Sequence, residues 1–193
     1  MTLRALATLT LVASWIGACA SEAPAPSVIR AIALKNPGFE EPAAPGRNCA
    51  AGWDCTMHAD PRSFRFFHDV ASPAAGKASL CIEPSGKEPW ALASQGVFDI
   101  AALQGARVRF SAAIRVDAVS GDGAGPYIVA RGAALAHDKC LVSGTQGWQR
   151  VAVKIDVPAQ APFIEVGVAL EGRGRVCFDD AILEIVRGPK SPV

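Results

Sequence analysis

The chain has 193 residues, of which 50% are hydrophobic, and it contains 14 prolines and 18 glycines. Nineteen Lys and Arg residues nearly balance eighteen Asp and Glu residues. There is therefore no basic field to hold nucleic acid phosphates, and no nucleic acid partner is expected.

The N-terminus has the features of an export signal, with a positive charge at Arg4 followed by an apolar run from Ala5 to Gly17. That run is shorter than the ~20 residues that a membrane-spanning helix requires. Residues 1–18 are therefore predicted to be a signal peptide. Residues 19–31 include a Pro/Ala-rich stretch and are predicted to form a tether. One domain is expected over residues 32–187, followed by a short tail at residues 188–193.

Two cleavage sites compete at the end of the signal. The sequence Ile16-Gly17-Ala18-Cys19 has the form of a bacterial lipobox, in which the cysteine is lipidated and becomes the new N-terminus. The overlapping Ala18-Cys19-Ala20 fits the small-residue pattern of ordinary secretion. We expect an exported protein of the cell envelope, anchored in the membrane through lipid on Cys19. A soluble periplasmic or secreted protein is the alternative.

Several segments of the domain alternate between apolar and polar residues, which is the pattern of strands buried on one face. The clearest are residues 107–116, 149–157 and 164–170. Further strands are expected at residues 79–82, 92–100, 127–132 and 176–186, and one helical turn at residues 100–105. Turns are expected between them, notably at residues 121–126, 143–147 and 172–174. Short strands divided by such turns predict an all-β, antiparallel sandwich.

The last predicted strand has an irregularity at Asp179-Asp180. Val176 and Phe178 fall in one phase of the alternation, whereas Ala181 and the apolar residues after it fall in the other. A one-residue slip requires a bulge or a bend. Two adjacent carboxylates at a bend need hydrogen-bond donors, water or a cation, so this position is a first indication of a site.

Export places the cysteines in a compartment that permits disulfides. Cys49 and Cys55 lie close together in a loop-like stretch and are predicted to be bonded to each other. Cys140 with Cys177 is a second candidate pair, and Cys81, which lies in an apolar run, is expected to be a buried free thiol. No C-x-x-C or H-x-x-x-H spacing occurs, which argues against a zinc site.

Four sequence elements follow one another along the domain. They are Asn36-Pro37-Gly38-Phe39-Glu40 with Gly52-Trp53, then Gly76-Lys77-Ala78-Ser79-Leu80, then Gly147-Trp148-Gln149-Arg150, and last Val176-Cys177-Phe178-Asp179-Asp180-Ala181. In this order they resemble carbohydrate-binding modules of families 4 and 9, within the galactose-binding-like group. The resemblance covers essentially the whole domain and implies a jelly-roll β-sandwich. It is more specific for the fold than for the ligand.

The resemblance also implies a structural Ca²⁺ site that joins the first strand, the Gly76–Lys77 loop and the last strand. Glu40 and Asp179 would supply carboxylate oxygens, with Asp180 as the alternative ligand. Carbonyls of Gly38 and Lys77 could complete the shell, since Ca²⁺ takes many backbone oxygens. Without an ion, Glu40 and Asp179 would simply accept backbone hydrogen bonds where the terminal strands pair.

Motifs of catalysis are absent or incomplete. The sequence has no G-x-S-x-G nucleophile elbow, and the glycine-rich residues 121–126 lack the Lys-Ser/Thr ending of a phosphate loop. Asp179 and Asp180 are neighbours in sequence, so they do not suit a pair of carboxylates that face each other across a cleft. The sequence predicts a protein that is not an enzyme.

A sugar-binding face is predicted from the resemblance and the alternation together. Trp90 follows the strand of residues 79–83, where the resembling modules present an aromatic side chain that stacks on sugar. Tyr127 and Arg131 are four residues apart on one strand and share a face. Gln95, on the neighbouring strand, would add an amide contact, although its parity differs from that of Trp90. The resembling modules use the positions of Trp53 and Trp148 structurally, so both are expected in the core.

The predicted function is that of a non-catalytic carbohydrate-binding domain of an envelope lipoprotein, with a poly- or oligosaccharide as ligand. The alternative is a structural or protein-interaction domain of the envelope without glycan binding, since a fold does not fix function. Aromatic residues along a groove would favour the first function. A flat face with only aliphatic or charged residues would favour the second.

Overall fold

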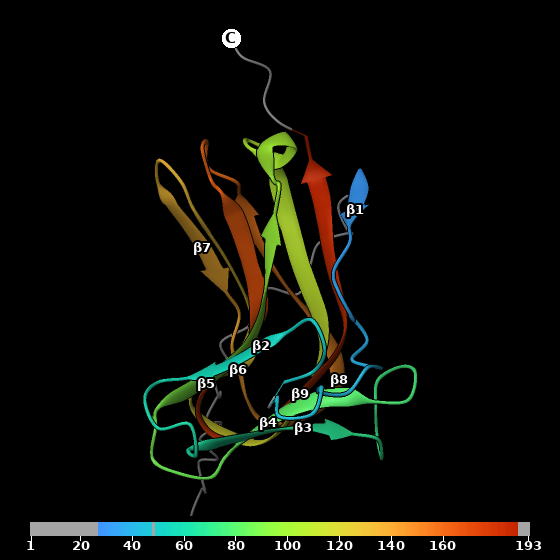
Figure 1. The fold of residues 1–193 in the computed structure, drawn as a ribbon, viewed down its shortest axis with the longest axis vertical. Coiled ribbons are helices and arrows are strands. Elements are labelled where there is room, and N and C mark those ends of the chain that lie inside the picture. The colour runs from blue at the N-terminus through green and yellow to red at the C-terminus, as the bar shows by residue number, and fades with distance from the viewer. Residues whose placement is uncertain (1–26, 48, 189–193) are drawn as a thin grey trace, which may run out of the picture.

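The computed structural model describes residues 27–47 and 49–188, which form an all-β fold (Figure 1). The signal peptide, the lipidation site Cys19 and residues 189–193 of the tail lie outside the described residues. The strands are β1 (Arg30–Ile32), β2 (Asp54–Met57), β3 (Phe64–Asp69), β4 (Ser79–Pro84), β5 (Trp90–Phe98), β6 (Arg107–Arg131), β7 (Leu135–Lys139), β8 (Val142–Asp156) and β9 (Phe163–Arg187). All pairings are antiparallel, so the predicted fold class is confirmed.

Two long strands, β6 and β9, pair with each other along most of their length and belong to both layers of the sandwich. The first sheet has the order β2, β5, residues 163–171 of β9, residues 123–131 of β6, and β7. The second sheet has the order β8, residues 107–117 of β6, residues 173–187 of β9, β4 and β3. The short β1 lies beside the C-terminal end of β9 (Figure 1).

Both long strands bend where they pass from one sheet to the other. The bend in β6 contains Gly121 and Gly123, and that in β9 contains Gly172 and Gly174, all with positive φ. The register of the β6–β9 pairing shifts at the same place. The turns predicted at residues 121–126 and 172–174 are therefore wrong, as is the one at 143–147, which lies within β8. Glycine adopts positive φ without steric cost, so the strands bend and keep their pairing.

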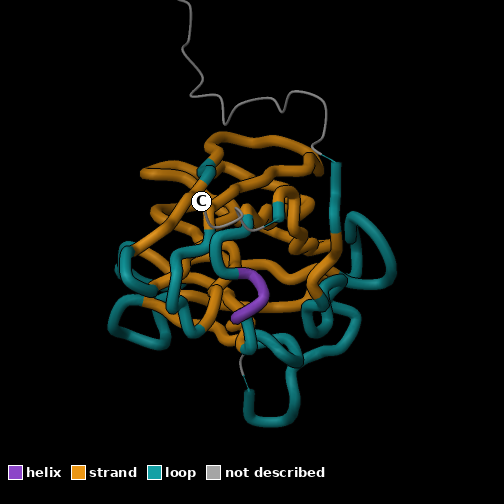
Figure 2. Tube along the Cα trace, turned by 90° about the horizontal axis from the view of Figure 1, so that it is seen from above, coloured by secondary structure: helices purple, strands orange, loops and turns teal. Residues whose placement is uncertain are grey.

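The core lies between the two sheets and is built from the apolar positions that the alternation identified. Buried side chains include Val108, Phe110 and Ile114 of β6, Val151, Val153 and Ile155 of β8, and Ile164, Val166, Val168 and Leu170 of β9. Seen from above, the strands occupy the middle of the molecule and most loops lie around them (Figure 2). The helical turn η1 (Ala101–Leu103) confirms the turn expected there, and its Leu103 is buried in the core. No helix among the described residues is long and apolar enough to cross a membrane.

The two tryptophans expected in the core have different places. Trp53 is buried beside Phe39 and Phe178, with ring centroids 4.9 and 6.1 Å away, as predicted. Trp148 is half-buried on the outside of β8, where its Nε1 donates to the carbonyl of Ser72 and the guanidinium of Arg115 lies 5.0 Å from its ring centroid. Its assignment to the core is wrong, because Val151 and the alternate residues after it take the inward positions of β8.

The disulfides confirm one prediction and correct two. Cys49 is bonded to Cys55, as expected. Cys81 of β4 is bonded to Cys177 of β9, so Cys81 is not a free thiol and Cys140 is not the partner of Cys177. Cys81 and Cys177 are directly opposite each other in the β4–β9 ladder, where Cβ atoms lie ~5 Å apart. The pair became recognisable only once the strand order was known.

The phase slip in the last strand is a bulge, as the alternation required. Between the pairs Ser111–Ile182 and Ala113–Asp179, β9 has one more residue than β6. Asp180 has a positive φ of 46°. Its carboxylate is exposed and pairs with Arg150 of β8, whereas Asp179 is completely buried. The two adjacent carboxylates therefore have different environments.

Candidate functional site

The outer face of the first sheet brings together three of the four residues predicted to contact a ligand. Trp90 of β5 lies opposite Glu171 of β9, and Tyr127 of β6 lies opposite Gly167 of the same strand. Residues 167 and 171 are four apart, so Trp90 and Tyr127 point from the same face. Arg131 follows Tyr127 by four residues and therefore lies on this face as well, where it is exposed.

Small residues form the floor of this face. Gly96 of β5 and Gly167 and Ala169 of β9 have the parity that points outward. A Cβ added to Gly167 would lie 2.8 Å from Cε1 of Tyr127, so the tyrosine ring lies over the glycine. The centre of the face therefore carries small side chains, and an aromatic ring lies over one of them.

A hollow of about 150 Å³ opens on this face, over β5, β6, β7 and β9. Its lining combines an aromatic ring, aliphatic side chains and charged groups. The lining residues include Leu92, Tyr127, Val129, His137, Lys139, Ala169 and Glu171. A concave site with apolar walls and a few placed polar groups is the usual form of a small-molecule site.

Two pairs of polar side chains fix the chemistry of the face. The hydroxyl of Tyr127 donates to Oε1 of Glu165 at 2.6 Å. Burial raises the pKa of the Tyr127 phenol well above its ordinary value, and the hydrogen bond to Glu165 adds to this effect. The phenol therefore stays protonated. Across the hollow, Nζ of Lys139 forms an ion pair with Glu171 at 2.7 Å.

Trp90 is held from one side by a histidine. It is half-buried at the start of β5, and the imidazole of His58 meets it edge-on with ring centroids 5.8 Å apart. His58 is itself positioned by Glu88, whose Oε2 lies 2.6 Å from Nδ1 of the imidazole. The indole thus lies at the edge of the outer face instead of capping the core.

Gln95 does not belong to this face. Its side chain is 5% exposed and points into the sandwich. The amide nitrogen donates to the carbonyls of Lys35 and Gly52, and the amide oxygen accepts from the backbone nitrogen of Lys35 at 2.7 Å. The predicted ligand contact is therefore wrong for Gln95, since its odd parity on β5 directs it inward and its hydrogen-bonding groups are occupied.

The residues predicted to bind Ca²⁺ come together beside the bulge of β9, in the second sheet. A Cβ placed on Gly38 would lie 3.9 Å from Oε1 of Glu40 and 3.9 Å from Oδ1 of Asp179, so the two carboxylates converge beside Gly38. The backbone nitrogen of Lys77 donates to both oxygens of Glu40 at 3.0 Å. The segment of Gly38 and Glu40, the loop of Lys77 and the last strand therefore meet here, as predicted.

Backbone nitrogens donate hydrogen bonds to Asp179, but no ion pair joins it to a basic side chain among the described residues. Its Oδ2 accepts from the backbone nitrogens of Ala74 and Ala75 at 2.9 Å, and its Oδ1 accepts from that of Asp180 at 2.7 Å. Burial still raises the pKa of Asp179, and the charge of Asp180 contributes, although the backbone amides oppose the shift. The negative charge is therefore undercompensated.

Buried polar atoms without partners lie in the strands that adjoin this position. Leu80 pairs with Phe178 in the β4–β9 ladder, so the next residues on the two strands, Ser79 on β4 and Asp179 on β9, lie beside each other. Its Oγ, and Nε2 of His68 on β3, are buried and have no hydrogen-bond partner among the described residues. Such atoms call for a bound water or ion. The carboxylates of Glu40 and Asp179, which converge beside Gly38, are oxygen ligands of the kind that a hard cation takes.

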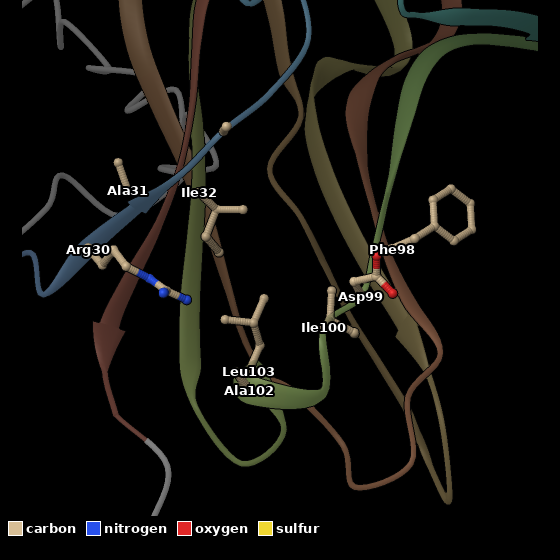
Figure 3. A pocket seen from close by; sticks show the side chains of 9 residues that line it. Arg30, Ala31, Ile32, Phe98, Asp99, Ile100, Ala102 and Leu103 are labelled. Atoms are coloured by element: carbon tan, nitrogen blue, oxygen red, sulfur yellow. The ribbon is translucent and has the colours of Figure 1, made fainter.

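A larger hollow, of about 230 Å³, lies between β1 and the segment that contains η1. Ile32, Ile100 and Leu103 line it, and Phe98 points away from it (Figure 3). Arg30 and Asp99 lie at its sides (Figure 3). None of the residues predicted to bind a ligand lines this hollow, and we assign it no function.

Several residues of the outer face were not predicted as site residues. Glu165, Glu171, Leu92, Lys139 and His58 all contribute to it. The alternation of residues 164–170 already placed Glu165 outward, so a signal was present for that residue. Leu92 and Glu171 lie in or next to predicted strands, but their place at the site required the strand order. Lys139 and His58 belong to strands or strand ends that the sequence pattern did not reveal.

Neither a family model nor a curated protein sequence matches the chain. Solved structures match its fold. The C-terminal family 22 carbohydrate-binding module of Clostridium thermocellum Xyn10B is 14% identical, with a TM-score of 0.54, over 82% of this chain and 93% of that module. The CBM22-1 xylan-binding domain of Paenibacillus barcinonensis Xyn10C is 16% identical, with a TM-score of 0.57, over 86% and 99% of the two chains. TmCBM61, solved with β-1,4-galactotriose, is 18% identical, with a TM-score of 0.53, over 78% and 95%.

The chain has the fold of carbohydrate-binding modules. At these identities the likeness establishes the fold and leaves the ligand to be argued from the site. The three modules belong to families 22 and 61, so membership of families 4 and 9 stays a prediction.

Proposed function

We propose that the protein is a non-catalytic carbohydrate-binding domain that binds a poly- or oligosaccharide on the outer face of the first sheet. The observation that carries the proposal is the placement of Trp90 and Tyr127 on one face, with the Tyr127 ring lying over Gly167. Sugar rings have apolar C–H faces that pack on aromatic side chains, while a few polar groups fix their orientation.

The polar groups of the face suit sugar hydroxyls. Glu165 accepts one hydrogen bond from Tyr127, which leaves a carboxylate oxygen for a ligand donor. Lys139 and Glu171 line the hollow as an ion pair and offer both donors and acceptors. A flat face with only aliphatic or charged residues, which would favour a scaffold, is not what the strands present.

The carboxylates of the face support binding without cleavage. Glu165 and Glu171 are six residues apart on β9, which corresponds to about 20 Å along a strand. Pairs that hydrolyse a glycosidic bond lie ~5 to ~9.5 Å apart. Each of the two is also engaged by its own partner, Tyr127 or Lys139.

Two further parts of the proposal concern the ion and the location. We propose that Ca²⁺ binds Glu40 and Asp179 with carbonyls of Gly38 and Lys77, where it would neutralise buried negative charge and join three chain segments. We also propose that the protein is exported and anchored in the envelope through lipid on Cys19, on the strength of the lipobox. Soluble export is the alternative.

A binding screen tests the main proposal. The purified protein is titrated with xylan, β-1,4-galactan, cellulose fragments and bacterial cell-wall polysaccharides in an affinity-electrophoresis or calorimetric assay. Retention by at least one polysaccharide is expected. Failure to bind any of them would favour the alternative function, a structural or protein-interaction domain of the envelope.

A further inference from the structure

A second group of aromatic side chains lies at the opposite end of the outer face. Phe98, the last residue of β5, is 68% exposed, although it is a large apolar side chain. It pairs with Phe163 of β9, and the two ring centroids are 5.7 Å apart. A Cβ on Gly96 would lie 3.0 Å from Cε2 of Phe98, so the Phe98 ring leans over the floor of the face.

This group belongs to the same face as Trp90. Both Trp90 and Phe98 are on β5, and their even spacing of eight residues gives them the same orientation. At a rise of ~3.3 Å per residue, about 26 Å separates them along the strand. The outward positions between them are Leu92, Ser94 and Gly96, of which only Leu92 carries a large side chain.

The strip from Trp90 to Phe98 alternates in chemistry. Trp90 and Leu92 are followed by Ser94, which is buried, and then by Gly96, opposite which Glu165 lies on the neighbouring strand. The aromatic pair of Phe98 and Phe163 comes next. A protein or lipid partner would be better served by a continuous apolar surface, whereas successive sugar rings present apolar faces and hydroxyl edges in turn.

Arg131 joins this second group. It follows Ala130, which pairs with Ile164, so the register places it beside Phe163. Its guanidinium is exposed and can donate several hydrogen bonds from a planar fork, a geometry that also stacks on ring faces. Arg131 does not line the hollow that contains Tyr127, and the second aromatic group gives it a place in ligand binding.

We propose that Phe98, Phe163 and Arg131 form a second sugar subsite at the end of the face remote from Trp90. The ligand is then an extended chain of several sugar units that lies along β5, not a single sugar or a short chain end. This inference rests on the proposed function and specifies the length and direction of the ligand.

The test compares Phe98→Ala with the wild type on oligosaccharides of increasing length. Linear β-1,4-xylo- and β-1,4-galacto-oligosaccharides of two to six units serve as probes, and calorimetry gives the affinities. We expect wild-type affinity to rise with length. Phe98→Ala should bind the six-unit probe at least fivefold more weakly and the two-unit probe equally well, while Trp90→Ala weakens binding of both.

Val70→Ala is the matched control, because Val70 is 74% exposed and follows β3 in the second sheet. It should bind every probe like the wild type. If Phe98→Ala binds the six-unit probe as tightly as the wild type while Trp90→Ala loses binding, the second subsite is refuted and the proposed function stands. If the wild type binds neither series nor any polysaccharide of the screen, both fail.

Discussion

The hydroxyl of Tyr127 on β6 donates to Glu165 on β9 at 2.6 Å, although Glu165 lies opposite Val129 and not opposite Tyr127. This diagonal contact, which antiparallel neighbours permit for long side chains, draws the phenol across the sheet. The ring thereby covers Gly167. The hydrogen bond and the glycine together determine how the aromatic ring lies on the outer face.

Removal of the Tyr127 ring is expected to weaken binding more than removal of its hydroxyl. Tyr127→Phe keeps the ring over Gly167 and should retain most of the affinity for a polysaccharide that binds the wild type. Tyr127→Ala removes the stacking surface and should weaken binding at least tenfold, about 1.4 kcal/mol. Calorimetric titration measures both. Equal affinities of Tyr127→Ala and the wild type would show that the ring does not contact the ligand.

Gln95→Ala should destabilise the protein without changing its affinity. The side-chain amide makes three hydrogen bonds to the backbone of Lys35 and Gly52. Their loss leaves buried groups unsatisfied, at a cost of about 2–3 kcal/mol. Urea denaturation gives the free energy of unfolding, and the same titration gives the affinity. A variant that keeps its stability but binds more weakly would place Gln95 at the ligand after all.

Chelation is expected to lower the melting temperature. A ligand that binds only the folded state stabilises it by about 2.7 kcal/mol at a concentration of ~100 Kd. Thermal melts with Ca²⁺ and with excess chelator should therefore differ for the wild type. They should coincide for Glu40→Gln, which lacks one ligand charge. Identical wild-type melts, together with no metal by elemental analysis, would contradict the Ca²⁺ site. Glu40 and Asp179 would then only accept hydrogen bonds from backbone amides.

The N-terminal prediction is tested by intact mass. Protein purified from membranes of a bacterial host should begin at Cys19 and carry acyl chains, because dual acylation holds a protein stably in a bilayer. The comparison sample is Cys19→Ser, which should be released from the membrane fraction. A mature wild-type chain that begins at Ser21 without acyl mass would establish ordinary secretion.

The alternation of apolar residues predicted the strands of the core and the inward or outward direction of most of their side chains. It also predicted an irregularity at Asp179-Asp180, a bulge or a bend, and the structure has a bulge there. The pattern did not reveal β1, β2, β3 and β7, which are short or at sheet edges and bury few side chains. Glycines that bend a strand look the same in sequence as glycines that end one.

The site was predicted only in part for a related reason. Periodicity places Tyr127 and Arg131 on one face of one strand, but it cannot say which strand lies alongside. The contacts of Tyr127 with Glu165, and of Trp90 with His58, depend on pairings between distant segments. The Cys81–Cys177 disulfide was missed in the same way.

The most direct test of sugar binding at this face compares two tryptophan variants. Trp90→Ala removes the aromatic side chain at the edge of the outer face, and Trp148→Ala removes the half-buried one outside β8. Titration with a polysaccharide from the binding screen should show at least a tenfold loss of affinity for Trp90→Ala, with a melting temperature close to that of the wild type, and no loss for Trp148→Ala. Equal affinity of Trp90→Ala and the wild type would contradict the account.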